Sequence, residues 1–167
     1  PGLPGIPIYH MLLAAPHGAK VLVDDIQVEP LREFSVLLYP TQPEAADTSL
    51  RQSEEDVPIS VDDMSDPPFV KDEEAYASSR PLPGNVVAVH PIGQVRDLDL
   101  VQISVATGQY IPAKEHLVIF KDVSFTLKYE GGEDGFLTKE REEIPFEQSS
   151  RYTYALAKNA EAVFEYP

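Results

Sequence analysis

Apolar and polar residues alternate in short runs along the chain, and this alternation is typical of strands with one buried face. The clearest runs cover residues 98–105 and 122–129, where large apolar side chains occupy alternate positions from Val101 and from Val123. The pattern also predicts strands over residues 6–15, 19–28, 34–39 and 86–92. We expect the nearly continuous apolar run 34–39 to be buried on both faces or to be short and central.

Breaks in the alternation predict where strands bend and end. Within residues 19–28 the apolar positions change parity at Asp24-Asp25, which predicts a β-bulge because the side-chain period of a strand is two. Turns are expected where glycine or proline interrupts the pattern. They fall at residues 16–18, 93–94 and 107–108, and Gly131-Gly132 is expected to end the last strand.

The end of the chain has a different period. Tyr152, Leu156, Ala160 and Val163 recur at steps of three or four, so the spacing predicts a helix over residues 150–164. Ser149 or Ser150 is a suitable N-cap. The helix either leads toward another domain or packs on the strands, and the periodicity is compatible with both.

Composition supports a single all-β domain. The 167 residues are enough for one hydrophobic core, and 43% of them are hydrophobic. Sixteen prolines and nine glycines divide the chain into pieces too short for long helices. We therefore expect a β-sandwich or barrel over residues 1–145, followed by a tail or linker over residues 146–167.

Residues 41–67 differ from the rest of the chain. This segment is proline-rich, carries eight acidic residues and has Arg51 as its only basic residue. It is too poor in large apolar side chains to fold by itself, so we expect a loop that is mobile or partly disordered in the free domain.

Charge and cysteine content exclude several classes of function. The formal charge of −15 repels nucleic-acid phosphates and anionic lipid headgroups. No apolar run approaches the roughly 20 residues of a membrane-spanning helix. The absence of cysteine removes disulfides, thiolate nucleophiles and zinc–thiolate sites. Because Pro1 begins neither a signal peptide nor an initiator sequence, we expect any targeting segment to lie upstream.

The chain has no recognisable catalytic signature. It lacks the nucleophile elbow, zinc-protease, phosphate-loop and EF-hand motifs. The four histidines (His10, His17, His90 and His116) have no metal-ligand spacing, so no metal or cofactor is expected. Acidic clusters such as Asp62-Asp63 are more typical of solvated loops than of calcium sites or glycosidase pairs. Asp97 and Asp99 are expected to tie down a tight turn.

Short motifs follow one another in a fixed order along the chain, among them Gly2-Leu3-Pro4-Gly5-Ile6-Pro7, Ala15-Pro16-His17-Gly18-Ala19 and Gly93-Gln94-Val95-Arg96-Asp97. This ordered set resembles the propeptide of gingipain-type cysteine peptidases. Gly2-Leu3-Pro4-Gly5-Ile6-Pro7 is similar to the opening motif of that family, and Ala15-Pro16-His17-Gly18-Ala19 to its first turn. Residues 38–43, 68–69 and 74–76 match the two sides of its long loop, residues 93–97 its G-x-x-R-D turn, and residues 125–129 its closing strand. Tyr110-Ile111-Pro112 departs from the usual Tyr-Asn-Pro, and Ala106 stands where a proline is common.

The resemblance implies an antiparallel β-sandwich of jelly-roll character. It also implies a secreted bacterial domain that is not an enzyme. The implied partner is the cognate cysteine peptidase, which the domain holds inactive, and whose folding it can assist, until proteolysis removes it. Arg51 is then the candidate inhibitory residue, because its guanidinium can bind a pocket carboxylate through two hydrogen bonds. Lys71 and Arg80 are the alternates.

Two other functions fit the same residues. A β-sandwich also serves as a carbohydrate- or surface-binding module, although the lack of tryptophan makes this chain poorly equipped for it. The domain could also be a permanently attached structural part of a peptidase relative. A peptidase domain directly downstream would exclude the binding module, and an inhibition assay would separate the remaining two.

Overall fold

The computed structural model describes residues 1–43, 68–95, 98–136 and 154–165. Within these residues, six strands form two antiparallel sheets of three strands each. The first sheet has the order β1-β4-β3 and the second has the order β2-β6-β5. The strands are β1 (Ile8–Ala15), β2 (Lys20–Ser35), β3 (Val87–Val95), β4 (Leu98–Ala106), β5 (Gly108–Ile111) and β6 (His116–Glu130).

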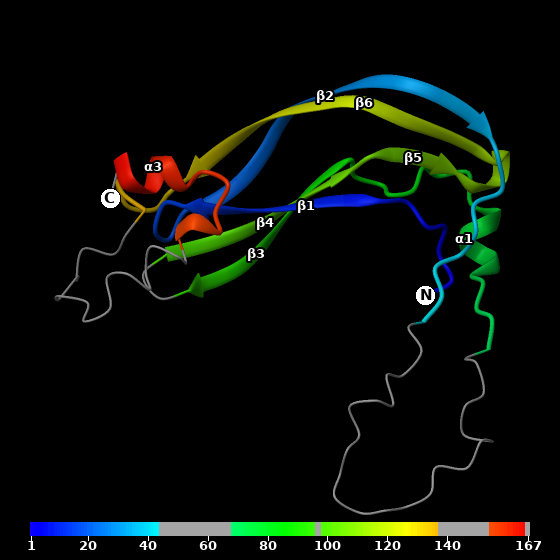
Figure 1. The fold of residues 1–167 in the computed structure, drawn as a ribbon, viewed down its shortest axis with the longest axis horizontal. Coiled ribbons are helices and arrows are strands. Elements are labelled where there is room, and N and C mark those ends of the chain that lie inside the picture. The colour runs from blue at the N-terminus through cyan, green and yellow to red at the C-terminus, as the bar shows by residue number, and fades with distance from the viewer. Residues whose placement is uncertain (44–67, 96–97, 137–153, 166–167) are drawn as a thin grey trace, which may run out of the picture.

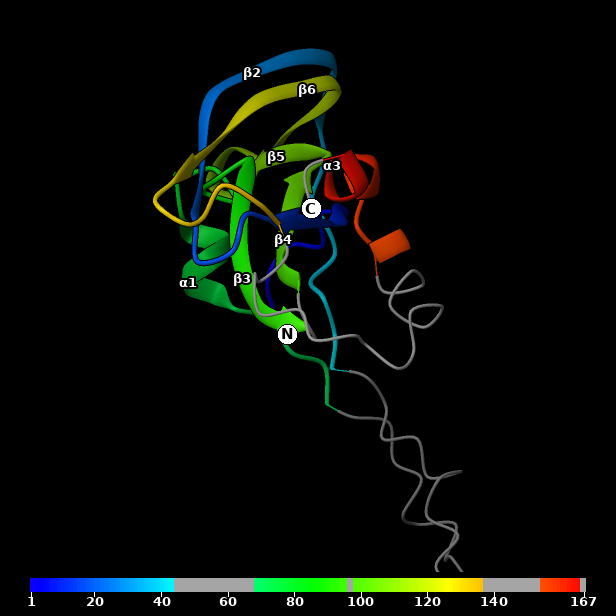
Figure 2. The same ribbon diagram turned by 90° about the vertical axis from the view of Figure 1, so that its left-hand side faces the viewer.

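The two sheets pack as the layers of a sandwich. Strands β2 and β6 pair along nearly their whole length and arch over the first sheet (Figure 1). The view turned by 90° shows β2 and β6 on one side of the molecule, with β4 and β1 below them (Figure 2). Helix α1 (Glu73–Ala77) and the N-terminus lie at one end of the long axis, and helix α3 (Ala160–Glu165) lies at the other. The predicted all-β fold is confirmed, whereas the jelly-roll topology stays a prediction.

The first sheet is buried on both of its faces along part of its length. β1 pairs with β4 in a continuous register from Ile8 opposite Ala106 to Ala15 opposite Asp99. Leu13, Val101 and Ile103 belong to the core between the sheets. Ala14 and Leu100, also opposite each other, belong to a second core on the outer face. This arrangement explains why β4 is buried at most positions and not only at every second one.

The bulge predicted at Asp24-Asp25 is present. The pairing of β2 with β6 shifts between Asp24 and Gln27, and Asp25 has a φ of 50°. A positive φ is typical of a bulged residue, and aspartate tolerates it better than most side chains do. The parity change in the sequence therefore located a real irregularity in the backbone.

The prediction of a separate strand over residues 34–39 is wrong. Phe34 and Ser35 end β2, and residues 36–39 lie outside the strands. Leu37 is 59% exposed and Tyr39 is 70% exposed, so the apolar run is not a buried central strand. Burial of an apolar run depends on what packs against it. Here residues 36–39 connect the end of β2 to the first side of the acidic segment.

Two predicted turns are also wrong in detail. Gly93-Gln94 lies inside β3, where the pairing with β4 shifts between Pro91 and Gly93, so this glycine marks a bulge and not the turn. Between β4 and β5 only Thr107 intervenes, and Gly108 already belongs to β5. β5 was not predicted, because four residues are too few for the alternation to be visible.

The predicted tail helix is interrupted. A helical turn at residues 154–155 is followed by irregular backbone and then by α3, so residues 154–165 do not form one helix. Tyr154, Ala157 and Val163 nevertheless belong to the outer core with Leu98 and Leu100. The described tail thus packs on the first sheet. The part of the predicted helix before residue 154 lies outside the described residues.

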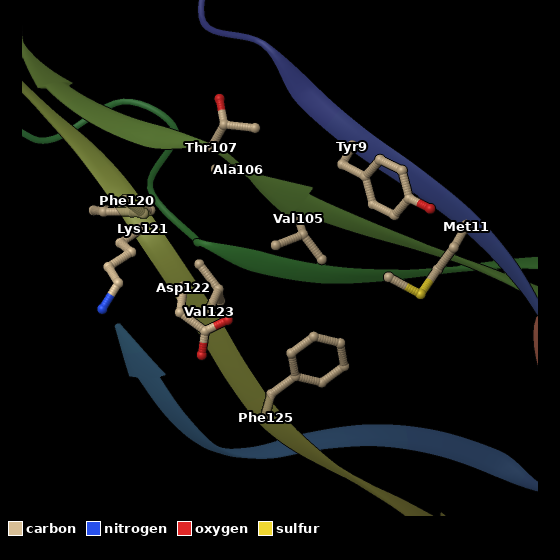
Figure 3. Close-up of a pocket in the computed structure, with 10 residues that line it drawn as sticks. All are labelled: Tyr9, Met11, Val105, Ala106, Thr107, Phe120, Lys121, Asp122, Val123 and Phe125. Atoms are coloured by element: carbon tan, nitrogen blue, oxygen red, sulfur yellow. The ribbon is translucent and has the colours of Figure 1, made fainter. Parts of the chain in front are cut away.

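A partly open cavity of about 250 Å³ lies between the sheets (Figure 3). Tyr9 and Met11 of β1 face Val123 and Phe125 of β6 across it. Its two charged lining residues are Lys121 and Asp122, and the Lys121 Nζ donates a hydrogen bond to Glu29 at 2.6 Å. The rest of the lining is mainly apolar.

Candidate functional site at the base of the long loop

The described residues on either side of the long loop are joined by one side chain. The Gln42 Nε2 donates to the carbonyl oxygens of Pro40 and Val70, both at 2.9 Å. The Val70 N–H donates in return to the Gln42 Oε1 at 2.8 Å. The amide of Gln42 therefore binds Val70 as the backbone of a neighbouring strand would. We call residues 38–43 and 68–72, which this amide holds together, the loop stem.

The N-terminal residues bind both sides of the loop stem. Gly2 donates its N–H to the Thr41 carbonyl at 2.6 Å and accepts from the Asp72 N–H at 3.0 Å. The Thr41 N–H donates to the Leu3 carbonyl at 2.8 Å. Gly2 has a φ of 88°, and a Cβ there would lie 3.0 Å from the Asp72 nitrogen, so the close approach requires glycine. The opening motif thus fixes both sides of the loop stem.

Aromatic side chains fix the stem to the body of the domain. The Tyr76 hydroxyl donates to the Leu38 carbonyl at 2.6 Å, and burial raises the pKa of this phenol above its usual value. Tyr110 is fully buried, and its hydroxyl accepts from the Leu38 N–H at 3.4 Å. Tyr39 packs edge-on against Phe69, with 5.5 Å between ring centroids. Because the two rings come from opposite sides of the stem, their contact closes it.

Lys71, one of the predicted alternates, lies at the stem. Its Nζ is 2.9 Å from the Glu73 Oε2 and 4.9 Å from the centroid of the Tyr76 ring. Asp72 caps α1 by accepting from the Ala75 N–H at 2.9 Å, which places Glu73 in the first turn next to Lys71. The Lys71 ammonium is therefore held by a carboxylate and an aromatic face of its own domain.

Arg80, the other alternate, follows α1 and is exposed. Its N–H donates to the Ser78 Oγ at 3.1 Å, and none of the ion pairs in the described part of the chain includes its guanidinium. Arg51 lies outside the described residues. The structure therefore brings Lys71 to the stem beside α1, leaves the Arg80 guanidinium without an ionic partner in the described part, and does not place Arg51.

Three of the four histidines have partners inside the domain. The His10 Nδ1 lies 3.0 Å from the Ser104 Oγ, the His17 Nδ1 lies 3.1 Å from the Asp99 Oδ2, and the His116 Nε2 lies 3.6 Å from the Glu33 Oε2. Asp99 also accepts from the Gly18 N–H at 2.8 Å. Asp99 therefore ties down the turn between β1 and β2. No cluster of three or more possible metal ligands occurs among the described residues.

The sandwich and the loop stem together describe how this domain holds its acidic segment. A packed β-sandwich holds the two flanks of a long acidic segment on a rigid stem, and the described residues contain no catalytic constellation. Binding residues often lie on segments that a rigid scaffold positions, so the flanks of this acidic segment are the candidate functional site.

The family model Propeptide_C25 matches residues 1–155, so the chain belongs to this family of cysteine peptidase propeptides. The domain is accordingly a non-catalytic propeptide, which agrees with the absence of cysteine from its sequence. Membership of this family favours a propeptide over a carbohydrate- or surface-binding module.

Two solved structures are similar in fold to this chain. One is the complex of the pro- and mature domains of RgpB from Porphyromonas gingivalis, with 18% identity and a TM-score of 0.67 over 95% of this chain and 73% of that chain. The other concerns the zymogenic latency of gingipain K from the same organism, with 19% identity and a TM-score of 0.55. The match to the gingipain K structure covers 77% of this chain and 66% of that chain. No curated protein matches the sequence.

Sequence reasoning missed Gln42, the residue that joins the two sides of the stem. Its motif, Leu38-Tyr39-Pro40-Thr41-Gln42-Pro43, was identified as a flank of the loop, but nothing in the motif indicated that the amide binds Val70, 28 residues away.

Within the described residues, no helix is both long enough and apolar enough to cross a membrane.

Proposed function

We propose that this domain docks on the cysteine peptidase of its own precursor and keeps that peptidase inactive until proteolysis separates the two. The precursor is then a secreted bacterial protein. In this proposal residues 1–145 form the inhibitory sandwich, and residues 146–167 connect it to the catalytic domain.

The observation that carries this proposal is the loop stem. Two hydrogen bonds join the Gln42 amide to the backbone N–H and carbonyl of Val70, and Tyr76 anchors the stem to the domain. A rigid stem reduces the entropy that a loop loses when it binds, and so favours insertion into a pre-formed cleft. The similar structures, one of zymogenic latency and one of a pro–mature complex, support the same function.

Within the loop, Arg51 is the proposed inhibitory residue. It is the only basic residue among eight acids between residues 41 and 67. Lys71 is less suited to this role because Glu73 and the Tyr76 ring already hold its ammonium. A peptidase pocket that accepts a basic side chain would bind Arg51 as a substrate mimic.

The inhibition constant of the purified domain against its mature peptidase tests both statements. Arg51→Ala should weaken inhibition by roughly 30-fold or more, because losing one partner of a buried charged pair typically costs about 2–5 kcal/mol. Arg80→Ala is the matched control and should change the constant by less than about threefold.

Two results would contradict the proposal at different levels. A change below about threefold for Arg51→Ala removes Arg51 from the mechanism but leaves inhibition intact. Failure of the wild-type domain to inhibit at all would favour the permanently attached structural domain.

A further inference from the structure

The tail is attached to β1 by a second side-chain amide. The Ala14 N–H donates to the Asn159 Oδ1 at 2.8 Å, and the Asn159 Nδ2 donates to the Ala14 carbonyl at 2.9 Å. The Lys158 N–H donates to the Leu12 carbonyl at 2.7 Å. We call these three hydrogen bonds the tail clamp. They join residues almost 150 positions apart in the chain.

The apolar contacts beside the clamp fix the tail to one face of the first sheet. Tyr154, Ala157 and Val163 pack with Leu98 and Leu100 in the outer core, and Val163 is fully buried. The outer core also includes Ala14, the residue that Asn159 binds. Polar contacts to β1 and apolar contacts to β1 and β4 therefore hold the same short segment of tail against the first sheet.

The tail clamp and the loop stem lie at opposite ends of the molecule (Figure 1). α1, which follows the stem, is at the N-terminal end of the long axis, whereas α3, which follows Asn159, is at the other. No bond of the clamp involves a stem residue. A substitution in the clamp should therefore leave the stem unchanged, because distant sites without shared partners act independently.

We propose that Asn159 is a positioning residue that locks the tail onto β1, and that opening of this lock gates the proteolytic separation of the domain from the peptidase. This inference rests on the proposed function, in which the chain continues from the tail to the catalytic domain. With the clamp closed, the backbone around Lys158 is bonded to β1 and packed on the sheet. A protease needs an extended, unpaired segment, so cleavage in or next to the tail requires local opening.

Proteolysis of the 167-residue domain by endoproteinase Lys-C tests the lock directly. The Lys158–Asn159 bond lies within the clamp, and Lys71 and Lys114 provide cleavage sites elsewhere in the same molecule. Asn159→Ala removes two hydrogen bonds and should accelerate cleavage after Lys158 by roughly tenfold or more, with cleavage after Lys114 unchanged. Asn159→Asp, which keeps the acceptor for the Ala14 N–H, should accelerate it less.

Gln42→Ala is the matched control, because it removes an equivalent amide from the loop stem. It should leave cleavage after Lys158 at the wild-type rate while weakening inhibition. Equal cleavage rates after Lys158 in Asn159→Ala and wild type would overturn the lock. A comparable acceleration in Gln42→Ala would overturn its assignment to Asn159.

The precursor that carries the peptidase provides the functional readout. Asn159→Ala should raise its rate of maturation by roughly the same factor, while the separate Asn159→Ala domain inhibits the mature peptidase within about threefold of wild type. Maturation at the wild-type rate overturns the gating role. Lack of inhibition by the wild-type domain instead contradicts the proposed function, and the Lys-C result is independent of that outcome.

Discussion

The two sheets of the domain differ in how much of their apolar surface is covered. In the first sheet, β4 is the central strand, with the second sheet on one face and the tail on part of the other. In the second sheet, β2 is an edge strand, and Ile26, Val28 and Leu31 are exposed along it. Apolar area removed from water is the main stabilising contribution to folding, so we expect the first sheet to contribute more to stability than the second.

This difference separates two tasks within one small fold. The tail is fixed to the first sheet through Ala14 of β1, whereas the loop stem is fixed to the second sheet through Tyr110 of β5. The long ribbon of β2 and β6 contributes fewer buried side chains for its length. Substitutions in the two sheets should therefore have unequal effects, although the residue types are the same.

Two isoleucines give the largest expected contrast. Ile103 in β4 is 0% exposed and Ile26 in β2 is 43% exposed. Ile103→Ala should lower the free energy of unfolding by about 2–5 kcal/mol, because it leaves a cavity between the sheets. Ile26→Ala should lower it by less than about 1 kcal/mol, because much of the side chain is already in water. Urea denaturation of both variants measures the contrast, and equal losses would refute it.

The connection between the sheets gives an intermediate effect. Gly108 begins β5, with only Thr107 between it and the end of β4, and a Cβ at Gly108 would lie 2.5 Å from the Val118 carbonyl oxygen of β6. Gly108→Ala should lower the free energy of unfolding by about 1–3 kcal/mol, because the clashing atom belongs to a paired backbone. Gly84 has no atom within 4 Å of the same position, so Gly84→Ala should leave the thermal midpoint unchanged or slightly higher. A similar loss in both variants would place the strain elsewhere.

The smallest effect is expected for the ion pair between Asp24 and Lys128 on the second sheet. The hydrogen bond that the Asp24 carboxylate accepts from Lys128 holds the pKa of Asp24 below its usual value. Because the folded pKa is lowered, the stabilisation is present above the unfolded pKa and is lost as the pH falls through the folded one. Both groups are exposed, so Lys128→Ala should return the pKa of Asp24 toward its usual value without a measurable change in the urea midpoint.

Carboxyl NMR titration of Lys128→Ala checks the pKa, and denaturation near neutral pH checks the midpoint. An unchanged Asp24 titration would show that Lys128 is not the cause. A clear fall in the midpoint would show that the second sheet depends on this pair more than its exposure indicates.

Local patterns in the sequence predicted the elements that local physics determines. The alternation around Val101 and Val123 located β4 and β6, and the parity change at Asp24-Asp25 located the bulge. The exposure of Val36, Leu37 and Tyr39 could not be predicted, because it depends on which parts of the fold pack against them. The family resemblance, confirmed by the match over residues 1–155, came from motif order and not from periodicity.

The side-chain amide contacts in the loop stem and in the tail clamp could not be predicted from the sequence, for a different reason. Gln42 and Asn159 are ordinary polar residues whose partners, Val70 and Ala14, lie 28 and 145 positions away. Only the fold brings each amide to a backbone with its N–H and carbonyl in matching positions. The placement of Arg51 is a prediction from sequence and family resemblance, and it depends on the inhibition measurement described above.

The tail clamp also changes how β1 can behave toward other molecules. β1 is an edge strand, and edge strands offer backbone groups that can pair with a strand from another copy of the protein and lead to aggregation. At Ala14 both of these groups are bonded to Asn159, and the Leu12 carbonyl is bonded to Lys158. An amide side chain cannot extend the sheet further. The clamp therefore blocks intermolecular strand pairing along this part of β1 without adding a new strand whose own edge would need protection.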